Sequence, residues 1–155
     1  GWLLRPFRQS DLNAYVEVRT VLERKALELA WTYLVDADLQ RMLDGNRLPK
    51  NDSEEPANDN SLHAYLIEKS GNHYIADFFA RHGQYYSILF DWEAHDRQAL
   101  INAVRQHRRI LKALLARDYK AADAALVDHI RSSHPVLRAP PSGYEQNLET
   151  MGPKH

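Results

Sequence analysis

The sequence predicts an all-α protein, an antiparallel bundle of about six helices preceded by a short extended segment. Apolar residues recur at three- and four-residue spacing over long stretches, which is the pattern of amphipathic helices. Helix-ending signals such as Gly45 and Gly71 separate these stretches, and no stretch beyond the first few residues alternates convincingly as a strand. With 155 residues, 44% of them hydrophobic, the chain is long enough for one domain with a substantial core.

The first residues and the last ones differ from the helical part. Residues 1–7 are extended in character, because Pro6 disfavours a helical conformation at Arg5. Such a short segment cannot form a sheet alone, so we expect an orphan strand or linker at the start of a chain cut from something longer. Residues 139–155 are polar and contain several prolines, so we expect a disordered tail.

The positions of the helices are predicted from capping residues and from apolar residues at helical spacing. Ser10 is the expected N-cap of a long first helix, and Asp11 adds a favourable charge to its first turn. The polar segment 46–58 contains Pro49 and Pro56 and is expected to be an exposed loop. The expected helices cover residues 10–35, 36–43, 58–69, 73–90, 93 or 96 to 117, and 120–137.

Composition limits the classes of function. The net charge of −1 provides no general attraction for phosphate backbones, so this stretch alone is a poor candidate for nucleic-acid binding. The absence of cysteine excludes disulfides and thiolate metal sites and fits a reducing cytoplasm. No apolar run approaches the roughly 20 residues that span a bilayer. We therefore expect a cytoplasmic protein with no membrane partner.

Three histidines occupy positions where the helical pattern calls for a buried apolar side chain: His63, His107 and His129. A single such histidine is more often a core residue with hydrogen-bonded ring nitrogens. Three of them on different helices are costly to bury without a common purpose. Asp59 precedes His63 by four residues, which places both on one face of a helix. The set predicts a metal site with one or two positions open to water or a small oxyanion.

Two other interpretations stay open at this point. A metal-dependent enzyme could use the same site to activate water, with Glu23 or Glu17 as a general base. Alternatively, the histidines are structural and the domain only dimerises. The sequence contains no nucleophile elbow, no His-Glu-x-x-His helix, no P-loop and no Gly-rich dinucleotide turn.

Several segments together resemble the FCD domain, the C-terminal effector-binding domain of FadR-type GntR transcription regulators. The resemblance covers about residues 11–137, so we expect an FCD-like domain over 10–138, and residues 1–9 look like the end of a winged-helix wing and its linker. It rests on residues 15–23, on Asp59-x-x-Leu62-His63, on residues 70–72, on residues 107–114 with Asp118 and Ala121 following, and on residues 128–130.

The resemblance implies a divalent metal ion bound by Asp59, His63, His107 and His129, with zinc first and nickel, manganese or iron as alternatives. It implies a small organic acid as the effector, held by the metal and by the effector-binding residues Arg19 and Asn72. Members that bind acyl-coenzyme A lack the histidine set, which favours a small acid here. It also implies a homodimer, for which the first and fourth helices are our candidate interface, and DNA binding through an upstream winged-helix domain. Gln106 departs from the family pattern, because many members have glutamate before the histidine.

Overall fold

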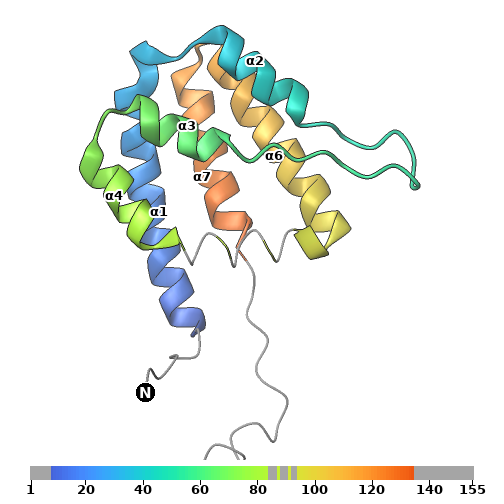
Figure 1. Cartoon of the computed structure of the whole chain (residues 1–155), viewed down its shortest axis with the longest axis horizontal. Helices are drawn as coiled ribbons and strands as arrows, with labels where there is room; N and C mark the ends of the chain where they lie inside the picture. The colour runs from blue at the N-terminus through green and yellow to red at the C-terminus, as the bar shows by residue number, and fades with distance from the viewer. Residues whose placement is uncertain (1–7, 84–86, 88–90, 92–93, 135–155) are drawn as a thin grey trace, which may run out of the picture.

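The computed structural model describes residues 8–83, 87, 91 and 94–134, and these residues form six α-helices and no β-strand. The all-α bundle expected from the sequence is therefore confirmed. Residues 1–7, the tail at 139–155 and the second half of the expected fourth helix fall largely or wholly outside the described residues. The elements are α1 (Gln9–Ala30), the 3-10 turn η1 (Trp31–Tyr33), α2 (Asp36–Gly45), α3 (Leu62–Lys69), α4 (His73–Arg81), α6 (Arg97–Leu115) and α7 (Tyr119–Ser132) (Figure 1).

Side-chain caps begin three of the helices. Asn72, Asp96 and Asp118 each accept hydrogen bonds from backbone N–H groups in the first turns of α4, α6 and α7. Gly71 ends α3 with a φ of 63°, the left-handed conformation that glycine adopts without strain. The N-cap expected at Ser10 is wrong, because α1 already begins at Gln9 and Ser10 lies within its first turn.

The core forms where α1, α6 and α7 pack side by side, with α3 crossing them (Figure 1). Helices α6 and α7 run antiparallel because only residues 116–118 join them. Leu12, Leu66, Leu111 and Leu126, one from each of these helices, are almost completely buried in the main apolar cluster. Helix α4 packs on α1 through a smaller cluster. No helix formed by the described residues is both long and apolar enough to cross a membrane.

Residues 46–58 leave the bundle as an arm and return to it (Figure 1). Its base is closed by Asn46, a fully buried residue whose Nδ2 donates to the backbone oxygen of Asp59 at 2.9 Å. Arg47 and Ala57 form an isolated antiparallel bridge just beyond it. Because Asp59 is held by Asn46, α3 begins only at Leu62. The expected start of that helix at residue 58 is wrong by four residues.

Candidate metal centre

Three buried histidines from three helices meet between α1, α3, α6 and α7. His63 comes from α3, His107 from α6 and His129 from α7, and their exposed fractions are 4%, 0% and 2%. Each is placed inward by the helical repeat, since a core leucine lies one turn away on the same face. These leucines are Leu66, Leu111 and Leu126.

The Nε2 atoms of the three rings point toward one another. Nε2 of His129 lies 3.0 Å from Nε2 of His63 and 3.1 Å from Nε2 of His107. The three residues form a group whose possible ligand atoms all lie within 4.8 Å of one another. Two nitrogens bound to one zinc ion at about 2.0–2.1 Å are at most about 4.2 Å apart, so the observed separations suit a shared ion.

The Nδ1 atoms point outward, and each has an oxygen partner. Nδ1 of His63 donates to Oε2 of Glu23 at 2.6 Å, and Nδ1 of His107 donates to Oδ1 of Asn58 at 2.9 Å. Nδ1 of His129 donates to Oε1 of Gln106 at 2.8 Å. Because carboxylate and amide oxygens accept here, the ring protons lie on Nδ1 and the Nε2 lone pairs face one another. Lone pairs at this separation repel unless a proton or a metal ion lies between them.

A chain of hydrogen bonds sets the orientation of Gln106. Ser132 Oγ donates to the backbone oxygen of Asp128, so it accepts from Nε2 of Gln106 at 2.9 Å. Oε1 of Gln106 then faces His129, and it also accepts from Ser133 Oγ at 2.8 Å. An amide held in this way can only accept from His129, which keeps Nε2 of His129 free to bind a metal.

A buried carboxylate stands behind His63. Glu23, on α1, is 1% exposed and also accepts a hydrogen bond from Nε of Arg19 at 2.7 Å. Burial alone would raise the pKa of Glu23, but the charge of Arg19 and the hydrogen bonds from His63 and Arg19 together hold that pKa far below its usual range. Glu23 is therefore ionised, and it forms the carboxylate–histidine arrangement that orients metal-binding imidazoles.

Burial keeps two of the histidines neutral. It lowers the pKa of His107 to about 3, with His63 and Arg19 acting in the same direction. It also lowers the pKa of His129 well below its usual value, assisted by His107, His63 and Arg19. A neutral imidazole is the form that binds a metal, so both rings are ready ligands at neutral pH.

Asp59 does not join the group of converging atoms. Its Oδ1 accepts hydrogen bonds from the backbone N–H of Ser61 at 2.9 Å and from Ser61 Oγ at 2.6 Å. Its side chain also lies against Gly45, where a β-carbon added to the glycine would be only 2.9 Å away. The residue before it, Asn58, contacts His107 instead. Asp59 therefore directly follows a residue that contacts the histidine cluster, but does not belong to the cluster itself.

The two expected effector-binding residues differ in position. Arg19 is 4% exposed and close enough to the cluster for its charge to lower the pKa of both His107 and His129. Asn72 caps α4, and its Oδ1 accepts from the backbone N–H groups of Tyr74 and Ile75. No contact described in the structure joins Asn72 to the histidines.

Three residues of the site were not assigned a role in it by the sequence: Asn58, Gln106 and Ser133. Glu23 was considered only as a general base. The i to i+4 spacing of Arg19 and Glu23 on the inner stripe of α1 was the available signal, since two opposite charges facing a core are expected to pair. A donor set of three imidazoles with a carboxylate behind one of them fits a divalent ion such as zinc.

The sequence model of one protein family, the FCD domain, matches residues 14–132. Comparison with curated proteins gave no significant match, and comparison with solved structures gave none either. The match covers most of the chain and every helix that contributes to the histidine cluster. The chain therefore belongs to the FCD family, a family of effector-binding regulatory domains of GntR-type transcription regulators.

Proposed function

We propose that this domain is a metal-containing sensor of a small carboxylate, and the dimerisation domain of a GntR-family regulator of the FadR subfamily. The convergence of the three Nε2 atoms supports this most directly, because every Nδ1 atom is held by an oxygen on its far side. Zinc is our first choice of ion, since three nitrogen ligands suit it. Nickel, manganese and iron remain alternatives, and cellular supply decides among them.

We propose Asp59 as the fourth ligand, as in the family pattern. The adjacent Asn58 contacts His107, so the carboxylate belongs to the segment beside the cluster. Asp59→Ala is expected to weaken metal affinity, whereas Asp52→Ala in the exposed arm serves as a control and leaves it unchanged. Equal metal affinity in both variants, measured by competition with a chelator of known affinity, would remove Asp59 from the ligand set.

The effector is proposed to be a small organic acid that binds the metal and Arg19. A buried guanidinium beside the histidines supplies a positive charge and a planar pair of donors that match a carboxylate. Asn72 remains a second candidate for this role, although its side chain caps α4. The acid can act only through its different affinity for two arrangements of the helices, typically about 1–3 kcal/mol.

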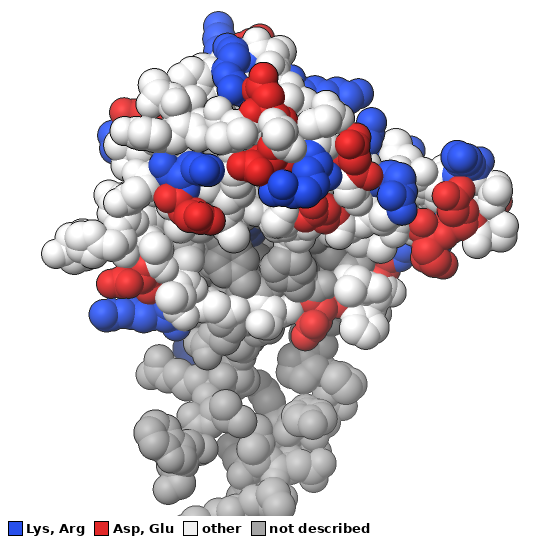
Figure 2. Space-filling view, turned by 45° about the horizontal axis from the view of Figure 1, so that its top comes forward, with Lys and Arg blue, Asp and Glu red and all other residues white. Residues whose placement is uncertain are grey.

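The domain is proposed to form a homodimer through α1 and α4. Val21 on α1 is 67% exposed and Tyr74 on α4 is 76% exposed, and a dimer interface over these helices would remove both side chains from water. DNA contacts are proposed to belong to a winged-helix domain joined to this one. Basic and acidic side chains alternate over the face shown in Figure 2, so this face offers no broad basic field to DNA.

The enzymatic alternative has little support from Glu23. Its carboxylate accepts hydrogen bonds from both Arg19 and His63, and its pKa is far below its usual range, so it is a weak base at neutral pH. The other candidate base, Glu17, lies on the exposed side of α1. Neither residue is placed to activate a water molecule.

The decisive experiment combines metal analysis with a panel of organic acids. Purified protein is expected to contain one equivalent of a divalent metal. Its melting temperature is expected to fall on treatment with a chelator and to rise with one class of acid, without formation of a product. Product formation from any acid would contradict the proposed sensor function and support the enzymatic alternative. Absence of metal together with a melting temperature unaffected by the chelator would leave the histidines with a structural role.

A further inference from the structure

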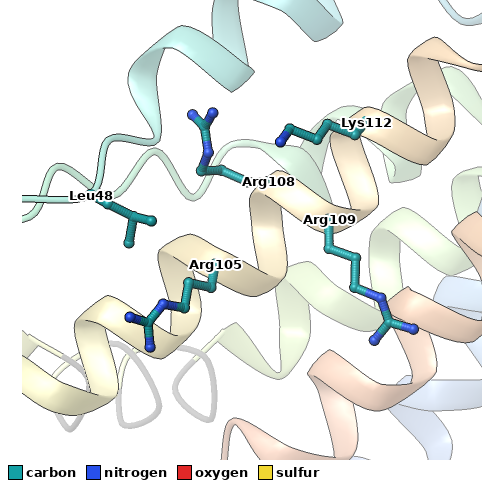
Figure 3. Close-up of a pocket in the computed structure, with 5 residues that line it drawn as sticks. All are labelled: Leu48, Arg105, Arg108, Arg109 and Lys112. Atoms are coloured by element: carbon teal, nitrogen blue, oxygen red, sulfur yellow. The ribbon is translucent and has the colours of Figure 1, made fainter.

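Helix α6 carries a group of basic side chains on the side opposite His107. Arg105, Arg108, Arg109 and Lys112 line a cavity of about 370 Å³ together with Leu48, and we call this the basic groove (Figure 3). The volume is within the range of roughly 300–1,000 Å³ found for small-molecule sites. No residue of the groove belongs to the histidine cluster.

Of the four positive charges of the basic groove, one is paired with a carboxylate in the part of the chain that the structure describes. Arg109 turns toward α7, where it pairs with Asp128 at 3.0 Å (Figure 3). Arg105 and Lys112 have no hydrogen-bond or ion-pair partner within residues 8–83, 87, 91 and 94–134. Like charges three or four residues apart destabilise a helix, so this arrangement has a cost that a bound anion removes.

Arg108 is held in place by backbone oxygens. Its Nη1 donates to the carbonyl oxygen of Asn46 at 2.6 Å and to that of Leu43 at 3.2 Å, so it joins α6 to the end of α2. Lys112 extends toward Arg108 in Figure 3. One side of the basic groove is therefore preorganised, while Arg105 and Lys112 are exposed and free to close on a ligand.

We propose that the basic groove binds a small phosphate monoester. A phosphate group offers three acceptor oxygens and a charge of about −1.5 to −2, which suits several neighbouring cations better than one carboxylate does. Leu48, 39% exposed at the edge of the basic groove, offers an apolar contact for the carbon part of the ligand. A long polyanion is a poorer occupant, because the arm beside the basic groove carries Asp52, Glu54 and Glu55 at its exposed tip.

The proposal does not depend on the metal, and its test is done on chelator-treated protein so that phosphate cannot bind at the histidines. Glycerol phosphate and inorganic phosphate are titrated by calorimetry at constant ionic strength, against the wild type and the double variant Arg105→Gln/Lys112→Gln. Loss of two charged contacts is expected to weaken binding of glycerol phosphate by tenfold or more, by order of magnitude. The matched control Arg81→Gln/Lys120→Gln removes two exposed charges elsewhere and is expected to bind like the wild type.

Four results are decisive. Saturable binding of glycerol phosphate, lost in the basic-groove variant alone, supports the proposal, and the same result for inorganic phosphate assigns the affinity to the phosphate group itself. Equal binding by both double variants overturns it. Binding of a random DNA duplex, but not of glycerol phosphate, with the same loss in the basic-groove variant also overturns it, in favour of a polyanion surface. Absence of any saturable binding at millimolar ligand overturns it as well.

Discussion

Replacing Glu23 with glutamine tests the support of the metal centre directly. The carboxylate accepts from His63 Nδ1 at 2.6 Å and from Arg19 Nε at 2.7 Å, one oxygen for each donor. Glutamine keeps the shape but has a single acceptor oxygen, and its amide group would face one of the two donors. The substitution therefore removes one hydrogen bond and the negative charge that compensates the buried guanidinium.

The expected loss can be worked out from these contacts. The one hydrogen bond that is lost contributes about 1.5–3 kcal/mol. Removing one member of a buried ion pair typically costs about 3–5 kcal/mol, a figure that includes such a lost hydrogen bond. A loss of about 4 kcal/mol is therefore expected, and at about 2–4 °C per kcal/mol for a domain of this size it lowers the melting temperature by about 8–16 °C. Loss of the partner of His63 is expected to weaken metal affinity by about 10- to 100-fold.

Glu28→Gln is the matched control on the same helix. Glu28 pairs with Lys25 at 3.0 Å, but both side chains are more than half exposed, so its replacement is expected to change stability by less than about 1 kcal/mol. Urea unfolding followed by circular dichroism, with added zinc and with chelator, measures stability, and chelator competition measures affinity. If Glu23→Gln unfolds at the midpoint of the control and retains wild-type metal affinity, the inferred role of Glu23 is wrong.

Three further outcomes are expected. Burial lowers the pKa of His107 to about 3 and also lowers the pKa of His129, so the unfolded state takes up protons that the folded state does not. Stability is therefore full above about pH 6.5 and falls below it by at most about 1.4 kcal/mol per pH unit for each histidine, and the contribution of His107 is lost only near pH 3. A urea midpoint that is independent of pH in chelator would contradict this. His107→Ala is expected to lose the metal and stay helical, so full stoichiometric metal in that variant would count against the assignment. Gln106→Ala is expected to weaken metal affinity by about tenfold with little change in helix content, and Gln98→Ala at the exposed start of α6 is its control.

The sequence predicted the features that depend on the local spacing of apolar residues, namely the helices and the residues on their buried faces. The spacing of His107 between Val104 and Leu111 placed it in the core, and the structure confirms this. The start of α3 was wrong, because hydrogen bonds from Asn46, thirteen residues away, hold Asp59 outside the helix. Such long-range contacts leave no periodic signal in the sequence.

The role of Glu23 was hidden for a similar reason. Its partner His63 lies forty residues further along the chain, so the sequence showed a carboxylate on an inner helix face without showing what it touches. Gln106 was recognised from the sequence only as a departure from the family pattern. Only the packing of α6 against α7 shows that this amide holds His129.

The closed base of the arm has a practical consequence. The chain leaves the bundle at Asn46 and returns at Asp59 through mutual hydrogen bonds, so the base of the arm stays closed whatever the length of the segment between them. At the tip of the arm, Arg97 of α6 donates to the backbone oxygens of residues 51, 52 and 54, exposed contacts that an insertion there would give up. Lengthening a closed loop costs little, about 0.6 kcal/mol for each doubling of its length. A circularly permuted fluorescent protein inserted between Asp52 and Ser53 is therefore compatible with an intact bundle. The arm offers a place to build a genetically encoded reporter for whatever ligand the domain recognises.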